Sequence, residues 1–358
     1  MTIKKALSLG LLATVGMVVA TSCNDDWKDE QYEHYISFKA PLDTKGTSVG
    51  VTTVYVPFTR LGSDLQPMYG PGKSHYDLPV IISGSSENED NFTVNIAHSD
   101  TLPILNKARM GERTELYYQD MWDFADVPST IRMYSGSDIE LLRIKFDFNG
   151  LDLTERYVLP ITVANGAGYK RNPRKNYATA MLRILPYTTY SGSYQAQGTQ
   201  FYILDADGNR VGDPGGMDTK MCYTVDENTV FFYAGQFDEK SQLRKHFKVY
   251  AKFVPETETT GKVEMWSDIE DMEFTQLGET SYTISEKTDA VQTHIMRRYV
   301  VMNGINYNFV DNYTARTIKS DGTVEAHPIH YNVSGTMTME RKLNTQMPEE
   351  DQVVWDEL

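Results

Sequence analysis

The stretch that decides the fold is ELLRIKFDF, Glu140–Phe148, in which apolar and polar side chains alternate. Successive side chains of a β-strand point to opposite sides, so this segment has an apolar face and a polar face. The apolar face consists of Leu142, Ile144, Phe146 and Phe148. The polar face consists of Arg143, Lys145 and Asp147. The pattern predicts a strand that is buried on one side and exposed to solvent on the other.

Comparable patterns recur through the first half of the chain, and helical periodicity is scarce. The other expected strands span residues 51–59, 78–83, 92–97, 130–135, 157–164 and 177–185. Turn residues separate these segments, and short strands at this spacing are typical of two packed antiparallel sheets. We therefore predict an all-β fold whose first domain, residues 34–187, is an immunoglobulin-like antiparallel β-sandwich.

A second set of strands begins after Leu185-Pro186-Tyr187, where Tyr190-Ser191-Gly192-Ser193-Tyr194 opens a new segment. Strand alternation is clear in FKVYAKF, Phe247–Phe253, and mixed alternation spans residues 293–302 and 324–341. Three dipeptides predict hairpin turns, namely Asp207-Gly208, Asn303-Gly304 and Asp321-Gly322. These features predict an antiparallel meander that can close into a barrel over residues 188–343. Residues 344–358 are expected to form a polar C-terminal tail.

Two motifs resemble known families. YVLPITV, Tyr157–Val163, preceded by a glycine and aliphatic turn, is similar to the signature of an N-terminal β-sandwich family of unknown function. That family is common in Bacteroidetes surface lipoproteins and is often encoded beside surface endoglycosidases. Residues 190–199, together with YNVSGTM at Tyr331–Met337, resemble the lipocalin-like C-terminal domain that accompanies it in proteins of polysaccharide-utilisation loci. The resemblance covers roughly residues 30–343 and implies architecture and setting, without family-wide binding residues.

The N-terminus resembles a bacterial lipoprotein signal. Lys4 and Lys5 precede the apolar run Ala6–Ala20, which is shorter than the roughly 20 residues of a membrane-spanning helix. Small residues stand directly before Cys23, as in a lipobox, where the thiol is acylated and anchors the protein to the membrane. Residues 1–22 are thus a predicted signal peptide and residues 23–33 a lipidated tether. A plain secretory signal with an incidental cysteine remains the alternative.

The residues after Cys23 indicate the compartment. Asn24-Asp25-Asp26 resembles the signal that sends Bacteroidetes lipoproteins to the outer face of the outer membrane. We therefore expect a protein that is lipid-anchored in the outer membrane and faces the cell exterior.

Charge and cysteine content restrict the partners. The 358 residues carry a formal charge of −15, and removal of Lys4 and Lys5 with the signal makes it −17. Such a surface repels nucleic acid and suits neutral or cationic ligands. If Cys23 is acylated, Cys222 has no cysteine partner, so neither a disulfide framework nor a cysteine metal site is expected. Cys222 is expected to be a small buried hydrophobic residue rather than a reactive thiol.

No catalytic, cofactor or metal motif stands out. The chain lacks a nucleophile elbow, a phosphate-binding glycine loop and a histidine pair at helical spacing. His327 and His330 would lie on opposite faces of a strand, and Pro328 favours a turn or an edge there. The acidic run Asp268–Glu273 could gather calcium but is better explained as a solvated loop, and Asp205–Asn209 as a hairpin turn. We predict no catalytic residue, no metal and no cofactor.

Two aromatic groups are candidate glycan contacts. In GKVEMW, Gly261–Trp266, the apolar Val263 and Met265 point one way, so Trp266 shares the polar face with Glu264. A ring on a polar face can stack on the apolar face of a sugar while a carboxylate accepts hydrogen bonds from the sugar hydroxyls. The alternative is a ring covered by a neighbouring loop.

The second group follows the long irregular stretch 100–115 and interleaves rings with acceptors. Its candidate contacts are Tyr117, Tyr118, Asp120 and Trp122. Long connections in compact domains are often functional. The same segment could equally plug the open end of the sandwich.

The leading hypothesis is a non-enzymatic surface lipoprotein that captures an oligosaccharide or polysaccharide for a neighbouring surface glycosidase and an outer-membrane importer. One alternative is a structural or adhesive module that binds protein partners through an exposed apolar patch. The other is a glycoside hydrolase, which would need two carboxyl groups facing one another across a cleft, one with a raised pKa.

Overall fold

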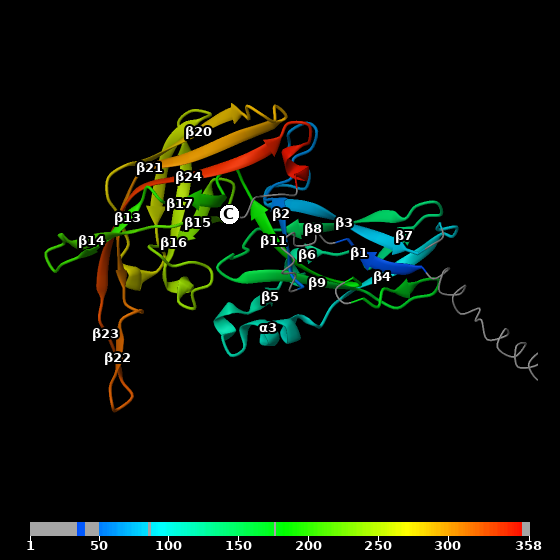
Figure 1. The fold of residues 1–358 in the computed structure, drawn as a ribbon, viewed down its shortest axis with the longest axis horizontal. Helices are drawn as coiled ribbons and strands as arrows, with labels where there is room; N and C mark the ends of the chain where they lie inside the picture. The colour runs from blue at the N-terminus through cyan, green and yellow to red at the C-terminus, as the bar shows by residue number, and fades with distance from the viewer. Residues whose placement is uncertain (1–33, 40–49, 85–86, 175–176, 353–358) are drawn as a thin grey trace, which may run out of the picture.

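The computed structural model describes residues 34–39, 50–84, 87–174 and 177–352. Figure 1 shows two β-rich units that lie side by side, and α3 (Leu102–Met110) is the α-helix of the described residues. The predicted all-β fold is confirmed. None of the described helices is long and apolar enough to cross a membrane. The predictions for residues 1–33, Cys23 included, lie outside the described residues.

The first unit is a sandwich of two sheets. The first sheet has the strand order β10 (Lys170–Arg171), β1 (Tyr35–Phe38), β3 (Lys73–Ser83), β8 (Ile139–Asp147) and β6 (Ala125–Asp126). The second has the order β2 (Thr52–Pro57), β11 (Thr179–Tyr187), β9 (Arg156–Val163), β4 (Phe92–His98) and β7 (Thr130–Met133), and β5 (Tyr118–Asp120) also pairs with β9. The two sheets enclose one apolar core.

The segment ELLRIKFDF forms a strand that is buried on one side and exposed on the other, as its alternation predicts. Leu142, Ile144 and Phe146 of β8 are at most 3% exposed, and Phe148 just after the strand is 1% exposed. Arg143, Lys145 and Asp147 are on the exposed face. Burial of each large apolar side chain contributes roughly 1.5–3 kcal/mol, so this face fixes the orientation of β8 on the core.

The pairing of the sandwich departs from the antiparallel prediction at three places. β1 pairs with β10, β2 with β11 and β5 with β9, all in parallel. A parallel pair needs a long crossover connection rather than a hairpin, and more than 100 residues separate β2 from β11. Alternation within a strand gives its buried face but not its partner, so these pairs could not be predicted.

The second unit is a closed antiparallel barrel of eight strands. Around the barrel the order is β12 (Gly192–Gln195), β15 (Lys220–Thr224), β16 (Thr229–Tyr233), β17 (Lys248–Pro255), β18 (Thr260–Trp266), β20 (Thr280–Thr288), β21 (Ile295–Asp311) and β24 (Ile329–Asn344). Pairing of β24 with both β12 and β21 closes the ring. The predicted sandwich-plus-barrel fold is thus confirmed.

Side chains fill the barrel interior. Val249, Ala251 and Phe253 of β17 point inward with Phe247, and none of the four is more than 1% exposed. Further buried rings belong to the same cluster, among them Phe232, Tyr282 and Tyr307. Small barrels are commonly filled in this way.

The predicted turn at Asn303-Gly304 is wrong. Both residues lie inside the 17-residue strand β21, where the register with β24 shifts between Met302 and Ile305. This shift is a β-bulge, and Gly304 adopts φ 71°, which glycine tolerates without a side-chain clash. Asp207-Gly208 and Asp321-Gly322 do lie in turns, between β13 (Gln200–Leu204) and β14 (Arg210–Gly216) and between β22 (Arg316–Ile318) and β23 (Val324–Ala326).

The two units meet at an apolar junction. Tyr223 of β15 and Phe231 and Tyr233 of β16 point out of the barrel and pack into the sandwich core. The Arg183 guanidinium of β11 binds Glu239 of the barrel at 2.5 Å, and the Tyr223 hydroxyl donates to the same carboxylate at 2.6 Å. β11 ends at Tyr187 and β12 begins at Gly192, so the chain crosses between the units within a few residues.

Candidate functional site

Trp266 is the last residue of β18, on the outer wall of the barrel. Its side chain is 37% exposed, whereas Val263 and Met265 of the same strand are buried in the barrel interior. Glu264 lies on the exposed face with Trp266, as the alternation predicts. The structure therefore places this ring and this carboxylate on one solvent-facing surface.

Tyr250 of β17 completes a pair of stacked rings with Trp266. The two residues are opposite one another in the register of β17 and β18, with ring centroids 5.2 Å apart and planes 12° apart. Tyr250 is half-buried and packs against the sandwich core. The ammonium of Lys248 lies 4.8 Å from the centre of the Tyr250 ring and binds Asp152 of the sandwich at 2.8 Å. These contacts hold the Tyr250 ring, and through it Trp266, in a fixed orientation.

Polar groups flank the stacked pair. Lys252 is opposite Glu264 in the strand register, and both are exposed. Within the described residues neither side chain has a hydrogen bond or an ion pair, so both can bind a ligand. We call Trp266, Tyr250, Glu264 and Lys252 the Trp266 platform. It offers a flat apolar surface beside one acceptor and one donor, which is the combination that a sugar ring requires.

The second predicted group lies in the sandwich, where Tyr118 packs rather than faces solvent. Tyr118 is 7% exposed, in a small cluster with Leu102 of α3, and its backbone hydrogen-bonds with the Asn106 side chain. The Arg156 guanidinium lies 4.6 Å from the ring centre and donates to the Tyr118 hydroxyl at 3.1 Å. A ring held in this way does not offer a stacking surface to a sugar.

The remaining members of that group are also tied to the protein. Tyr117 donates its hydroxyl to the Gly111 carbonyl at 2.5 Å. Asp120 binds His98 at 2.5 Å and accepts from the Trp122 backbone N–H at 2.9 Å. The Trp122 ring packs edge-on against His98, with centroids 4.8 Å apart, and against the sandwich core. These contacts favour the second interpretation of this segment, in which it closes the open end of the sandwich instead of binding a ligand.

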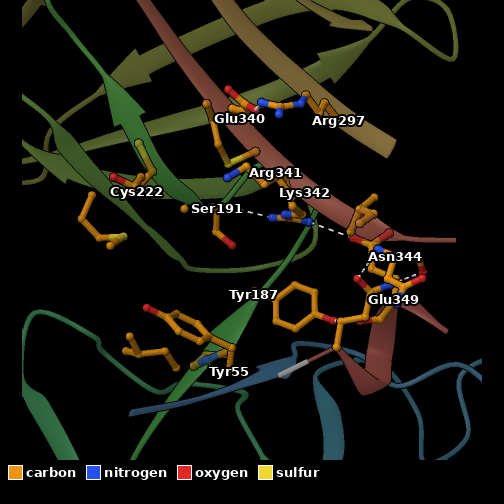
Figure 2. Close-up of a pocket in the computed structure, with 18 of the residues that line it drawn as sticks. Tyr55, Tyr187, Ser191, Cys222, Arg297, Glu340, Arg341, Lys342, Asn344 and Glu349 are labelled. Atoms are coloured by element: carbon orange, nitrogen blue, oxygen red, sulfur yellow. Dashed lines mark hydrogen bonds and ion pairs between the residues drawn. The ribbon is translucent and has the colours of Figure 1, made fainter. Parts of the chain in front are cut away.

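A pocket of about 620 Å³ lies at the junction, at a place that the sequence did not indicate (Figure 2). One wall comes from the sandwich, through Tyr55 of β2 and 185–187 of β11. A second comes from β12 and β15 of the barrel, and a third from the ends of β21 and β24 and the residues that follow. The Arg341 guanidinium lies 5.4 Å from the centre of the Tyr187 ring, and Figure 2 shows both residues and Tyr55 among those that line the cavity.

The charged groups of this pocket are largely paired with one another. Arg341 is 5% exposed, binds Glu349 at 2.9 Å and donates to the carbonyl oxygens of Thr188 and Ser191. Arg297 binds Glu340 at 2.6 Å, and Asp289 outside the pocket at 2.5 Å. These pairs leave the charges around the pocket close to balanced, and most of the surface that lines it is apolar.

Cys222 also borders the pocket and is 1% exposed. Burial raises the pKa of its thiol well above the ordinary value, so the reactive thiolate is suppressed. The expectation of a small buried hydrophobic residue is confirmed.

Metal ligands do not converge anywhere in the described ranges. No three His, Cys, Asp or Glu side chains there come together in a way that could hold a metal ion. Asp205 accepts hydrogen bonds from the backbone N–H groups of Asp207 and Asn209 at the β13–β14 turn. Asp271, in the acidic run, accepts from the Tyr313 hydroxyl at 2.7 Å.

Sequence reasoning missed Tyr250 and the whole junction pocket. The alternation of Tyr250 with Val249 and Ala251 is visible in the sequence and places Tyr250 on the outer face of its strand. Its pairing with Trp266 depends on the register of two strands, which the sequence does not give. The pocket unites segments near residues 55, 186, 222 and 341, so no local pattern could have found it.

Two family models match the chain. A domain of unknown function, DUF4973, matches residues 27–167, and a model described as a C-terminal domain matches residues 178–338. No curated protein sequence matches it.

Solved structures of Bacteroides proteins match nearly the whole chain. One, an auxiliary nutrient binding protein from Bacteroides thetaiotaomicron, is 38% identical, with a TM-score of 0.74 over 90% of this chain and 100% of the other. A Bacteroides ovatus protein of unknown function is 35% identical, with a TM-score of 0.75, and the match again covers 90% of this chain and 100% of the other. Another from Bacteroides ovatus is 28% identical, with a TM-score of 0.70 over 92% of this chain and 98% of the other. The chain belongs to the same family as the Bacteroides thetaiotaomicron protein.

Proposed function

We propose that this member of the family is a non-catalytic glycan-binding lipoprotein of the outer membrane, and that the Trp266 platform is its glycan contact. The observation that carries the proposal is the exposed Trp266 ring, held nearly parallel to Tyr250 beside an uncommitted carboxylate and ammonium. The Bacteroides thetaiotaomicron relative is described as an auxiliary nutrient binding protein, which supports a binding role. A surface that binds sugars is consistent with that role.

The chemistry of the carboxyl groups supports binding rather than hydrolysis. A glycosidase needs a general acid whose pKa is raised into the working range. Among the described residues, every Asp or Glu whose pKa departs clearly from its ordinary value is shifted downward. For Asp289 the causes are the backbone N–H of Gln292 and the Arg297 guanidinium. A carboxylate in such a setting accepts hydrogen bonds but does not donate a proton at neutral pH.

The proposed placement at the cell surface follows from the N-terminal residues. Acylation of Cys23 would anchor the chain, and the acidic residues after it would direct the protein to the exterior. There it would hold an oligosaccharide or polysaccharide for a surface glycosidase and an outer-membrane importer.

A glycan-array screen of the soluble form that lacks Met1–Cys23 would identify the ligand. Calorimetric titration with the best oligosaccharide then tests the platform. Trp266→Ala should weaken binding at least about fivefold, which corresponds to roughly 1 kcal/mol of lost contact, at an unchanged melting temperature. Tyr134→Ala is the matched control, because Tyr134 is 50% exposed but lies on the sandwich. Unchanged affinity of Trp266→Ala would remove the platform from the site, and a large fall in its melting temperature would assign the ring to packing.

Protein binding is a second candidate function, favoured by two hairpins with exposed apolar side chains. Ile203 opposes Val211 in the β13–β14 hairpin, and Ile318 opposes Val324 in the β22–β23 hairpin. All four side chains are at least 42% exposed. Figure 1 shows both hairpins projecting from the barrel end that is remote from the sandwich. A protein partner could be bound there while a glycan occupies the platform.

A further inference from the structure

We infer that the junction pocket is a second ligand site, separate from the Trp266 platform, and that it takes a neutral, largely apolar small molecule. The inference rests on the volume of the pocket, the chemistry of its walls and the pairing of its charges. It is independent of the proposed glycan function.

The size and the walls of the pocket are those of a small-molecule site. Its volume of about 620 Å³ falls within the roughly 300–1,000 Å³ typical of such sites. The side chains of Met221, Leu343 and Met347 supply apolar surface, and Tyr55 and Tyr187 also line the pocket. Methionine side chains adapt to ligand shape, so this wall can fit a range of apolar outlines.

The charges around the cavity favour a neutral ligand. Arg341 is bound to Glu349, which also binds Arg298 at 2.8 Å. Arg297 is shared between Asp289 and Glu340. An anion that entered would have to displace one of these carboxylates, and a buried charge left without compensation is costly. Lys342 also borders the pocket but is exposed, so solvent already stabilises its charge.

Two polar groups can orient a neutral ligand. Ser193 and Gln195 of β12 point outward, because Tyr194 between them is fully buried in the barrel interior. Both border the pocket, and neither side chain has a hydrogen bond within the described residues. A hydroxyl and an amide at one wall of an apolar cavity would bind a ligand that carries one or two uncharged polar groups.

The pocket and the platform are distinct surfaces. Trp266 and Tyr250 do not line the pocket, and β16 lies between β15 of the pocket and β17 of the platform. A change at one site should therefore leave the other intact. This separation makes the inference testable with paired variants.

Two fluorescent probes that share one ring system give the test. N-phenyl-1-naphthylamine is neutral, and 8-anilinonaphthalene-1-sulfonate adds a sulfonate to the same rings. Titration of the folded full chain should show one site for the neutral probe, with at least tenfold weaker binding of the anion. Equal affinity for the two probes would overturn the inference that the pocket selects a neutral ligand.

Ser193→Trp tests the location, because Ser193 is half-buried and a larger ring there would fill the cavity. The Ser193→Trp substitution should lower the affinity for the neutral probe at least tenfold. Ser281→Trp is the matched control, since Ser281 is exposed on β20 away from the pocket. Neither it nor Trp266→Ala should change probe affinity more than twofold.

Circular dichroism and melting temperature establish that each variant is folded. If Ser193→Trp does not fold, Gln195→Trp at an exposed position replaces it. Undiminished probe binding in a folded Ser193→Trp or Gln195→Trp variant would place the probe elsewhere and overturn the inference. Loss of probe binding in Trp266→Ala would likewise overturn it, because the platform would then be the probe site.

Discussion

Replacement of Glu239 by glutamine should strongly destabilise the junction between sandwich and barrel. The Glu239 carboxylate binds the Arg183 guanidinium of β11 through two contacts, at 2.5 and 3.3 Å, and accepts from the Tyr223 hydroxyl. Glutamine keeps the size of the side chain but removes its charge. The guanidinium, whose side chain is 13% exposed, would then lack its anionic partner.

The magnitude follows from the pKa of Glu239. Burial alone would raise this pKa, but the attraction of Arg183 outweighs it and lowers the pKa from the ordinary 4.5 to about 2. That difference corresponds to about 3 kcal/mol of stabilisation, in line with the roughly 3–5 kcal/mol lost when one partner of a buried pair is removed. Because the folded pKa lies below the unfolded one, the stabilisation is complete above pH 4.5 and disappears as the pH falls towards 2.

Urea denaturation at several pH values measures this effect. At pH 7 Glu239→Gln should lower the free energy of unfolding by about 3 kcal/mol, and the gap to the unmodified protein should shrink between pH 4.5 and 3. Glu264→Gln is the control, because Glu264 is exposed and has no ion pair within the described residues; its effect should stay below about 0.5 kcal/mol. A fall of less than about 0.5 kcal/mol in the free energy of unfolding of Glu239→Gln at pH 7 would refute the reasoning. A difference in stability between the variant and the unmodified protein that did not depend on pH would refute it as well.

Three further predictions concern the anchor, a buried histidine and the two units. Cys23→Ala should abolish membrane retention and leave the fold intact; a variant that still sediments with membranes after a high-salt wash would contradict the lipid anchor. Burial lowers the pKa of His75 to about 4, so up to about 3 kcal/mol of stability should be lost as the pH falls from 6.5 to 4, and His75→Gln should flatten this part of the stability profile. Residues 29–187 and 188–347 should each give a β-sheet circular dichroism spectrum when expressed alone, although the second exposes Tyr223 and should associate; disordered spectra for both would contradict two separable units.

Periodicity predicted the parts of the fold that depend on a single strand. Leu142 and Ile144 are buried because each strand has one face on a core, and a period of two reports that face directly. Pairing is a different property. Asn303-Gly304 has the composition of a hairpin turn, yet β21 continues through it because β24 pairs with it on both sides of the bulge. A turn dipeptide cannot show whether the chain reverses or only bends.

The difference between properties of one strand and properties of the folded whole also explains why the exposure of one aromatic group could be predicted and the burial of the other could not. The exposure of Trp266 follows from its own strand, so the sequence could predict it. The burial of Tyr118 depends on α3 and Arg156, which approach it only in the folded sandwich. Composition alone made the two aromatic groups look equivalent, but tertiary contacts use one for packing and leave the other on the surface.

The position of Tyr250 links the platform to the junction. One side of its ring stacks on Trp266, while the residue packs against the sandwich core and Lys248 reaches across to Asp152. A ring that is already fixed before a ligand arrives loses little conformational entropy on binding, so more of the contact energy remains as affinity. In the proposed complex the sandwich would contribute to the platform without touching the ligand, because its contacts hold Tyr250 in place. The proposed capture of a glycan would need only such a rigid surface, since binding breaks no covalent bond.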